Sequence, residues 1–380
     1  MAGRRKLLYF VSVDWYFVSH RLTLAVAAKA AGFDVWIATH VMRHADVIRD
    51  AGLTLIPITL ERSSLDPFRE LRSLTELVTH YRRVRPDLVH NVAVKPVVYG
   101  TLAARSARVG GIVNAFMGLG WVFSSDSAKA RALRPLVRAA LRASLAGKNT
   151  RTIVQNADDA ALLVDQRLTR QQHIRLIRGS GVDPKKYSTA APPAGVPLVV
   201  LPARLLVAKG VGEFMRAAAM LKAEGIAARF ALVGKPDPDN VAAVAREEIE
   251  RFVATGDVEY WGWREDMPKV FSEASVVCLP TFYGEGLPKA LLEAAASARA
   301  IVATDVPGCR EIVRRGENGW LVPPRDVKGL AGALREAIVR PDLCTRYGAT
   351  GRRIVEREFS LDAVIRDTLA VYEELVARPV

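Results

Sequence analysis

The feature that most constrains the fold is an alternation, along almost the whole chain, of short apolar runs with segments of helical period. The runs are rich in β-branched residues, as in KLLYFVSV (6–13), DVWIATH (34–40), PLVVLPAR (197–204) and AIVATD (300–305). Between them lie segments such as RLTLAVAAKAAG (21–32), apolar on one helical face. This alternation favours parallel sheets covered by helices on both faces. About a dozen such strands are more than a single open sheet usually contains, so we expect two Rossmann-like α/β domains.

A stretch rich in Gly, Pro and small residues, GSGVDPKKYSTAAPPAGVP, interrupts this alternation near the middle of the chain. It predicts an interdomain linker at 181–196. One domain is then expected at 1–180 and a second at 197–358. A helical segment follows at 359–380.

The composition is that of a soluble globular protein, with 50% hydrophobic and 25% charged residues among 380. Cys278, Cys309 and Cys344 are odd in number and show no CxxC spacing, which suits a reducing cytosol. No run reaches the roughly 18 apolar residues of a spanning helix. The opening RRKLLYFVSV is expected to be a first strand rather than a signal peptide, because Asp14 ends the apolar run early. The expected location is cytoplasmic.

The net charge of +14 is concentrated in one half of the chain. Residues 1–190 hold 29 Lys and Arg against 14 Asp and Glu, whereas residues 191–380 hold 25 against 26. Such asymmetry predicts a polyanionic or membrane-surface partner for the first half. No nucleic-acid-binding motif accompanies it, so nucleic acid is not expected as a partner.

Residues 127–151 contain seven basic residues and no acid. Arg131, Arg134, Arg138 and Arg142 recur at helical spacing beside an apolar stripe of Leu133, Val137, Leu141 and Leu145. One interpretation is a basic amphipathic helix lying on the anionic inner face of the cytoplasmic membrane. The other is an ordinary surface helix whose stripe packs on the first domain.

The segment FYGEGLPKALLEAAA (282–296) carries the strongest chemical signal. Gly286 permits close approach of a ligand, and Pro288 suits the first position of a helix. The N-terminus of that helix predicts a phosphate site, and Glu293 would accept hydrogen bonds from a ribose at the same mouth. Glu285 would then face a different part of a sugar nucleotide. The alternative is an ordinary helix start with one exposed Glu.

Three further candidate segments begin where a predicted strand passes into a loop. LPARLLVAKGV (201–211) sets Arg204 and Lys209 at the carboxyl edge of the sheet, where two cations would hold a diphosphate. Solvated surface charges are the alternative. LVGK (232–235) and YWGWRED (260–266) place Gly234, Trp263 and Arg264 where they would flank a base, although the tryptophans are as readily explained by packing.

SVDWYFVSH (12–20) ends the first strand, at the sheet edge where Rossmann-like domains bind ligands. The candidates for binding a second ligand there are Asp14, Trp15, Tyr16, His20 and, further along the chain, Lys95. Each has a packing or capping alternative. The DPD sequence at 237–239 is expected to be a turn rather than a metal ligand pair, and no metal cofactor is expected.

Taken in order, ARLLVAKGV, LVGK, WGWREDMPKVFSEASVVCLPT, GEGLPKALLEAAA and TDVPGCREIV resemble the second half of the family 4 retaining glycosyltransferases. DWYFVSHRLTLA, HNVAVKPVVYG, FMGLGWVF, IVQNADD and GSGVDPKKY resemble the bacterial branch of that family that builds capsule, O-antigen and exopolysaccharide. The resemblance covers nearly the whole chain. It implies the GT-B fold, in which two Rossmann-like domains face each other across a cleft and the last helix crosses back to the first domain.

The resemblance also implies roles for the candidate residues. Arg204 and Lys209 would grip the donor diphosphate, Glu293 the nucleotide ribose, and Glu285 the transferred sugar. Gly286, Leu287 and Pro288 would supply backbone N–H groups or shape. The implied reaction is transfer with retention from a nucleotide-diphosphate sugar, with UDP favoured, to a glycan acceptor carried on polyprenyl diphosphate.

The chain departs from the family pattern at three points. FMGLG lacks the histidine that many members carry after the corresponding strand; His90 is the nearest candidate, with a core histidine as the alternative. Gly284 stands where relatives often have Arg, and SARAIV replaces a more usual Cys-Gly or Gly-Gly. Other readings are a GT-B-like sugar-nucleotide epimerase or a catalytically silent membrane-associated scaffold. An epimerase would need additional acid/base residues, and a scaffold would not need Glu285, Glu293, Arg204 and Lys209 together.

Overall fold

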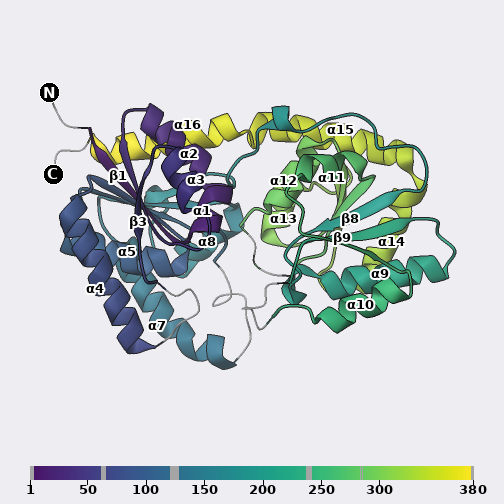
Figure 1. Cartoon of the computed structure of the whole chain (residues 1–380), viewed down its shortest axis with the longest axis horizontal. Coiled ribbons are helices and arrows are strands. Elements are labelled where there is room, and N and C mark those ends of the chain that lie inside the picture. Colours follow the sequence, from purple (N-terminus) through teal and green to yellow (C-terminus); the bar gives the residue numbers. More distant parts are fainter. Residues whose placement is uncertain are drawn as a thin grey trace. The chain divides into compact units, whose positions relative to one another are not determined.

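The computed structural model describes residues 4–60, 66–119, 128–236, 242–282, 284 and 286–377. The chain divides into two compact units. Unit 1 comprises Met1–Ser180 with Val364–Val380, and unit 2 comprises Gly181–Ala363. Each unit is built on one parallel sheet (Figure 1), which confirms the two Rossmann-like α/β domains expected from the strand–helix alternation.

The sheet of unit 1 has seven strands in the order β3-β2-β1-β4-β5-β6-β7, all paired in parallel. The strands are β1 (Lys6–Val13), β2 (Asp34–His40), β3 (Thr54–Pro57), β4 (Leu88–Val92), β5 (Gly111–Ala115), β6 (Thr150–Val154) and β7 (Ile174–Leu176). The helices are α1 (Asp14–His20), α2 (Leu22–Ala30), α3 (Ala45–Asp50), α4 (Pro67–Val84), α5 (Val94–Ser106), α7 (Ala128–Leu145), α8 (Ala157–Asp165) and α16 (Leu361–Val376), with a 3₁₀ turn η1 (Gln171–His173).

The central strand of unit 1 is apolar on both faces because helices cover both. Along β1, Leu7, Tyr9 and Val11 point to the face that packs on α1, α2 and α16. Leu8 and Phe10 point to the other face, where α4 and α5 lie (Figure 1). Successive side chains of a strand alternate between faces, so a strand covered on both sides reads as a continuous hydrophobic run.

The sheet of unit 2 has six parallel strands in the order β10-β9-β8-β11-β12-β13. The strands are β8 (Leu198–Pro202), β9 (Arg229–Val233), β10 (Glu259–Gly262), β11 (Val276–Leu279), β12 (Ala300–Thr304) and β13 (Gly319–Val322). The helices are α9 (Val211–Ala223), α10 (Arg246–Ala254), α11 (Met267–Glu273), α12 (Lys289–Ala296), α13 (Pro307–Ile312), α14 (Val327–Val339) and α15 (Pro341–Glu358), with 3₁₀ turns η2 (Pro184–Lys186) and η3 (Val207–Lys209). One face of this sheet packs on α11, α12, α13 and α15, and the other on α9, α10 and α14.

The C-terminal helix returns to the first domain, as expected. Val364, Val371, Tyr372 and Leu375 of α16 belong to the same hydrophobic core as β1 and β4 of unit 1. The phenol oxygen of Tyr372 lies 2.7 Å from that of Tyr9 and 2.6 Å from Nδ1 of His90. An ion pair adds to this packing, because Nε of Arg151 donates to Glu374 at 2.8 Å.

Residues 181–196, predicted to be an interdomain linker, belong to unit 2, and their first part packs within that unit. Val182 forms a parallel bridge with Ser360, and Nη1 of Arg352 donates to the carbonyl oxygens of Pro184 and Tyr187. Gly181 has a φ of 71°, and a Cβ there would lie 2.7 Å from Cα of Leu361. The two points where the chain passes from one unit to the other therefore lie side by side.

The basic segment 127–151 forms α7 for most of its length, and its apolar stripe faces inward. Leu141 and Leu145 are buried in a core cluster against which Val137 packs. This packing supports the alternative of a surface helix packed on its own domain. The side chains of Arg131, Arg138 and Arg142 are exposed, as is Leu136. Within the described ranges, no helix has the length and apolarity required to cross a bilayer.

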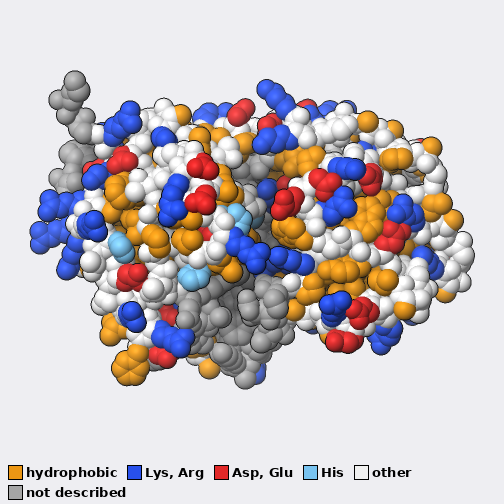
Figure 2. Space-filling view, in the orientation of Figure 1, with side chains coloured by type: hydrophobic (Ala, Val, Ile, Leu, Met, Phe, Trp, Pro, Cys, Tyr) orange, Lys and Arg blue, Asp and Glu red, His pale blue; other side chains and the backbone are white. Residues whose placement is uncertain are grey.

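The surface charge follows the asymmetry of the sequence. Figure 2 shows basic side chains gathered at the left-hand end of unit 1, whereas basic and acidic side chains are interspersed on the drawn face of unit 2. On this face, therefore, positive and negative side chains of the near-neutral half of the chain are also mixed in space.

Candidate functional site

The candidate site of unit 2 lies at the point where the strand order of its sheet reverses. The first strand, β8, is flanked by β9 on one side and by β11 on the other. Loops leave the carboxyl ends of β8 and β11 toward opposite faces of the sheet, and open parallel sheets bind ligands in the crevice between such loops. Arg204 and Lys209 follow β8, and Gly286–Pro288 follow β11, so the two strongest sequence motifs meet at this point.

Backbone contacts hold these two loops together. The amide of Phe282 and Oγ1 of Thr281 both donate to the carbonyl oxygen of Ala208, each at 3.0 Å. Oγ1 of Thr304 in turn donates to the carbonyl of Thr281, which adds the end of β12 to the group. Arg204 and Lys209 are half-buried on the first of these loops.

Two glycines permit the close packing of the loops. Gly210 has a φ of 75°, and a Cβ at this position would lie 2.1 Å from the carbonyl oxygen of Pro280. A Cβ at Gly234, where φ is 154°, would lie 1.9 Å from the carbonyl oxygen of Ala203. Gly234 therefore lets the end of β9 approach the β8 loop. This close packing is a structural reason for the glycine, which the sequence analysis placed beside a nucleotide base.

Helix α12 begins one residue later than the sequence suggests. Pro288 is its N-cap, with φ −64° and ψ 115°, and Lys289 is the first helical residue. Gly286, Leu287 and Pro288 are buried directly before this N-terminus. The free N–H groups and the positive end of the dipole of α12 therefore lie at the carboxyl edge of the sheet, the edge from which the β8 loop with Arg204 and Lys209 also leaves.

Glu293 lies one turn inside α12, and its residue is 9% exposed. The hydroxyl of Tyr187 donates to its Oε1 at 2.9 Å, and Nζ of Lys289 lies 3.5 Å from the same oxygen. No described residue bonds its Oε2, which leaves one carboxylate oxygen for a ligand. Burial, followed by the charge of Glu293, raises the pKa of Tyr187, so the phenol stays protonated as the donor. Tyr187 was not among the sequence candidates, because it lies in the stretch predicted to be a linker.

The remaining donor-side candidates are placed as follows. Glu285 and the DPD sequence at 237–239 lie outside the described residues. Trp263 is 59% exposed, and Nζ of Lys235 lies 5.4 Å from the centroid of its ring. Arg264 is paired with Asp266 at 2.9 Å. Trp263 and Arg264 both follow β10, the edge strand, which is two strands away from β8. They therefore lie farther than Gly234 from the switch point, the place between β8 and β11 where the strand order reverses.

Asp14, at the start of α1 in unit 1, anchors a loop. It is fully buried, and its carboxylate accepts four backbone N–H bonds of 2.7–2.9 Å, from Trp15, Met42, Arg43 and His44. Burial alone would raise its pKa, but these amides outweigh burial and hold the pKa below its ordinary value. This geometry favours the capping alternative over direct contact with an acceptor.

The other acceptor-side candidates fall into two groups. The rings of Tyr16 and His20 stack at 4.3 Å between centroids, and Trp15 meets Tyr16 edge-on at 5.9 Å. Nζ of Lys95 donates to Glu70 at 2.7 Å and so ties α5 to α4. Trp15, Tyr16 and His20 therefore lie together on α1, whereas Lys95 lies between α5 and α4, paired with Glu70.

His90 is a core residue of β4. It is 1% exposed, its ring stacks on Tyr9 at 5.0 Å, and its Nδ1 bonds the phenol of Tyr372. Burial, with a smaller contribution from the charge of Arg21, lowers its pKa well below the ordinary value, so the imidazole is neutral. These surroundings favour the alternative of a core histidine over a residue that touches the donor sugar.

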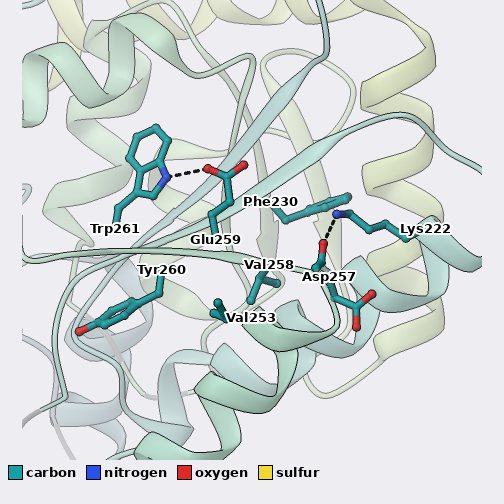
Figure 3. A pocket seen from close by; sticks show the side chains of 9 residues that line it. Lys222, Phe230, Val253, Asp257, Val258, Glu259, Tyr260 and Trp261 are labelled. Atoms are coloured by element: carbon teal, nitrogen blue, oxygen red, sulfur yellow. Dashed lines mark hydrogen bonds between the residues drawn. The ribbon is translucent and has the colours of Figure 1, made fainter.

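A hollow of about 450 Å³ opens at the other end of the sheet of unit 2 (Figure 3). Its walls include Lys222, Phe230 and Tyr260, and Trp261 turns its indole N–H to Glu259 at 2.8 Å. The strands β9 and β10 begin here, whereas the motif residues follow strand ends. The hollow is thus separate from the candidate site.

Comparison with known proteins identifies both halves of the chain. Residues 6–155 match the family model "Glycosyl transferase 4-like", and residues 196–339 match "Glycosyl transferases group 1". The chain is 28% identical to the N,N'-diacetylbacillosaminyl-diphospho-undecaprenol alpha-1,3-N-acetylgalactosaminyltransferase of Campylobacter jejuni, over 82% of this chain and 83% of that one.

Solved structures with the same fold match nearly the whole length of the chain. Sucrose-phosphate synthase from Thermosynechococcus elongatus superposes with a TM-score of 0.82 at 21% identity, over 98% of this chain and 100% of that one. The Anabaena protein HepE, in complex with UDP and glucose, superposes with a TM-score of 0.77 at 16% identity, over 97% and 99% of the two chains. At these identities the likeness establishes the fold.

Proposed function

We propose that this chain, which belongs to the family 4 glycosyltransferases of the GT-B fold, transfers a sugar with retention from a UDP-sugar to a polyprenyl-diphosphate-linked glycan. The product would enter cell-surface polysaccharide. Glycosyl transfer itself follows from the family. The donor, the stereochemical course and the acceptor are proposed from the chemistry of the site.

The observation that carries the donor proposal is the convergence at the switch point of unit 2. Arg204 and Lys209 lie on the loop after β8, the N-terminus of α12 follows the loop after the neighbouring strand β11, and hydrogen bonds to Ala208 join the two loops. A diphosphate there would be held by both, and the charge that grows on it as the glycosidic bond breaks would be stabilised without reorganisation. Oε2 of Glu293 would accept hydrogen bonds from the ribose at the same mouth.

Retention follows from this arrangement if the acceptor attacks from the side on which the diphosphate leaves. The departing phosphate oxygen would then take the proton of the acceptor hydroxyl. Glu285 would bind hydroxyls of the transferred sugar. Because the helix end and two fixed cations provide the electrostatic stabilisation, the proposal needs no divalent metal ion.

Two relatives support the choice of donor and acceptor classes. The structure of HepE is a complex with UDP and glucose. The Campylobacter jejuni relative is named for an acceptor built on diphospho-undecaprenol. An anionic, membrane-bound acceptor would also account for the charge excess of residues 1–190 and for the exposed Arg131, Arg138 and Arg142 of α7. The working location would be peripheral, on the inner face of the cytoplasmic membrane.

The test is incubation of the purified protein with a panel of UDP-, GDP- and ADP-sugars and a bacterial membrane lipid extract, followed by mass analysis of the lipid fraction. The expected result is a gain of one hexose or N-acetylhexosamine from a UDP-sugar, undiminished by a chelator and lost in Glu293→Ala. Transfer from GDP- or ADP-sugars alone would refute the UDP assignment. A reversible loss of turnover in chelator would refute metal independence.

A further inference from the structure

Unit 1 contains a buried arginine that no described carboxylate pairs with. Arg21 joins α1 to α2 and is 4% exposed. Its Nη1 reaches the carbonyl oxygen of His20 at 3.3 Å, and its Nη2 reaches the sulfur of Met117 at 2.9 Å. Its Nε is buried with no hydrogen-bond partner among the described residues, and no described carboxylate pairs with this guanidinium.

The other two buried arginines of the described chain are satisfied in ordinary ways. Arg151, 3% exposed, is paired with the carboxylate of Glu374. Arg299, 2% exposed, donates to the backbone carbonyls of Phe271, Ala190 and Ser272. A charge removed from water without a counter-charge is costly. Arg21 has only one backbone carbonyl and a thioether as acceptors, and no described carboxylate neutralises its charge.

A second buried donor points at the same atom. Gln155 is 1% exposed, and its Nε2 lies 3.1 Å from the sulfur of Met117. Two strong donors thus converge on a thioether, which is a weak acceptor. An anionic oxygen at that position would take both hydrogen bonds and neutralise the guanidinium.

The surroundings allow such an oxygen to enter. Met117 follows β5 and Gln155 follows β6, so both lie at the carboxyl edge of the sheet of unit 1, where parallel sheets bind ligands. Met117 and His20 are only half-buried. The unbranched side chain of methionine has three rotatable bonds and can move aside at little cost.

We propose that Arg21 and Gln155 form a phosphate seat in unit 1, which Met117 fills when no ligand is bound. All residues of the seat belong to unit 1. Its assignment to the acceptor rests on the proposed function: the occupant would be a phosphate of the polyprenyl diphosphate carrier. Binding of phosphate itself does not depend on turnover.

The first experiment measures inorganic pyrophosphate binding by calorimetry in an Arg204→Ala/Lys209→Ala background, which weakens the site of unit 2. Pyrophosphate is expected to bind this protein and to raise its Tm. Adding Arg21→Met should weaken binding by at least about tenfold. Arg21→Lys, which keeps the charge, should retain part of the affinity. Equal binding with and without Arg21→Met would overturn the proposal.

Thermal stability without anion separates a ligand seat from a structural arginine. Arg21→Met should leave the Tm unchanged or raise it, because no ion pair is lost. The matched control is Arg151→Met, which loses the pair with Glu374 and should lower the Tm while leaving pyrophosphate binding intact. A fall in Tm for Arg21→Met as large as that of the control would overturn the proposal by showing a structural role.

A second experiment distinguishes the sources of phosphate. With a short-chain polyprenyl-diphosphate acceptor, Arg21→Met should raise the acceptor KM by about tenfold or more and leave the Kd for UDP unchanged. With a phosphate-free alkyl glycoside acceptor the variant and the parent should have the same KM. Loss of pyrophosphate binding with an unchanged KM for the diphosphate acceptor would assign the seat to free phosphate and overturn its link to the acceptor. If no transfer occurs with any acceptor, the proposed function fails while the pyrophosphate titration still decides the seat.

Discussion

The phenol of Tyr187 donates a 2.9 Å hydrogen bond to Oε1 of Glu293, across 106 positions of sequence. Tyr187 belongs to the stretch that opens unit 2, and Glu293 to α12. This bond uses one oxygen of the carboxylate and fixes its rotamer, so that Oε2 keeps a defined direction. A ribose-binding carboxylate would gain from such support because less rotamer freedom remains to be lost on binding.

Tyr187→Phe should weaken nucleotide binding without unfolding the protein. The ring packing against Phe271 persists, while the hydrogen bond that orients Glu293 is lost. The expected loss is about fivefold in the Kd for UDP, from a contribution of about 1 kcal/mol. Calorimetry with UDP measures it, and Tyr260→Phe, at an exposed position, is the matched control. An unchanged Kd in Tyr187→Phe would show that Glu293 needs no positioning by the phenol.

Lys209→Ala and Arg204→Ala should each reduce turnover by about 10²–10³ while leaving the fold intact. Both residues are half-buried on the β8 loop and outside the hydrophobic core, so stability should change little. Steady-state kinetics with the donor sugar checks the effect, together with circular dichroism of each variant. Lys222→Ala, which removes a lysine at the other end of the sheet, should have normal turnover. A kcat equal to that of the parent in both site variants would contradict the diphosphate role.

Much of the fold was predictable from the sequence, and the site only partly. Strands such as LVVLP were recognisable because both of their faces are buried. The motif at α12 was recognisable because a Gly, a Pro and an acid occur at short spacing. Tyr187 and Arg21 were not, since the contacts that single them out are with Glu293 and Met117, which are far away in sequence. His90 and Asp14 were expected at a ligand site because polar residues at strand ends often contact ligands. In the structure His90 instead bonds Tyr372, which in turn bonds Tyr9. The carboxylate of Asp14 accepts hydrogen bonds from four backbone amides.

Tyr372→Phe should destabilise unit 1, because the C-terminal helix is joined to the sheet through this hydroxyl. The change leaves Nδ1 of His90 and the hydroxyl of Tyr9 without their buried partner. The expected cost is about 1–3 kcal/mol in the free energy of unfolding. Urea denaturation, followed by tryptophan fluorescence, measures it. Tyr347→Phe in unit 2, whose hydroxyl makes no hydrogen bond to another described residue, should cost clearly less; equal costs would contradict a role for the network.

The carboxylate of Asp14 should make unit 1 sensitive to acid. Its folded-state pKa lies below the unfolded value of about 3.9, so its contribution is present above that value and is lost as the pH falls through the folded pKa. Asp14→Asn should therefore be less stable than the parent at neutral pH, with a difference that shrinks below about pH 4. Thermal unfolding between neutral and acid pH tests this. A stability difference that stays constant down to the acid limit would contradict an ionised Asp14.

Binding to anionic membranes should depend on the exposed arginines of α7 rather than on its apolar stripe. Leu141 and Leu145 are buried in unit 1, so the helix would meet a bilayer through Arg131, Arg138 and Arg142. Replacing all three with Gln should remove up to about 3 kcal/mol of attraction to vesicles rich in anionic lipid. Co-sedimentation at low salt measures the loss, and high salt should abolish binding of the parent because the Debye length shortens. Arg229→Gln/Arg246→Gln/Arg264→Gln in unit 2 is the charge-matched control. Equal binding by the α7 variant and this control would place the membrane contact elsewhere on the protein.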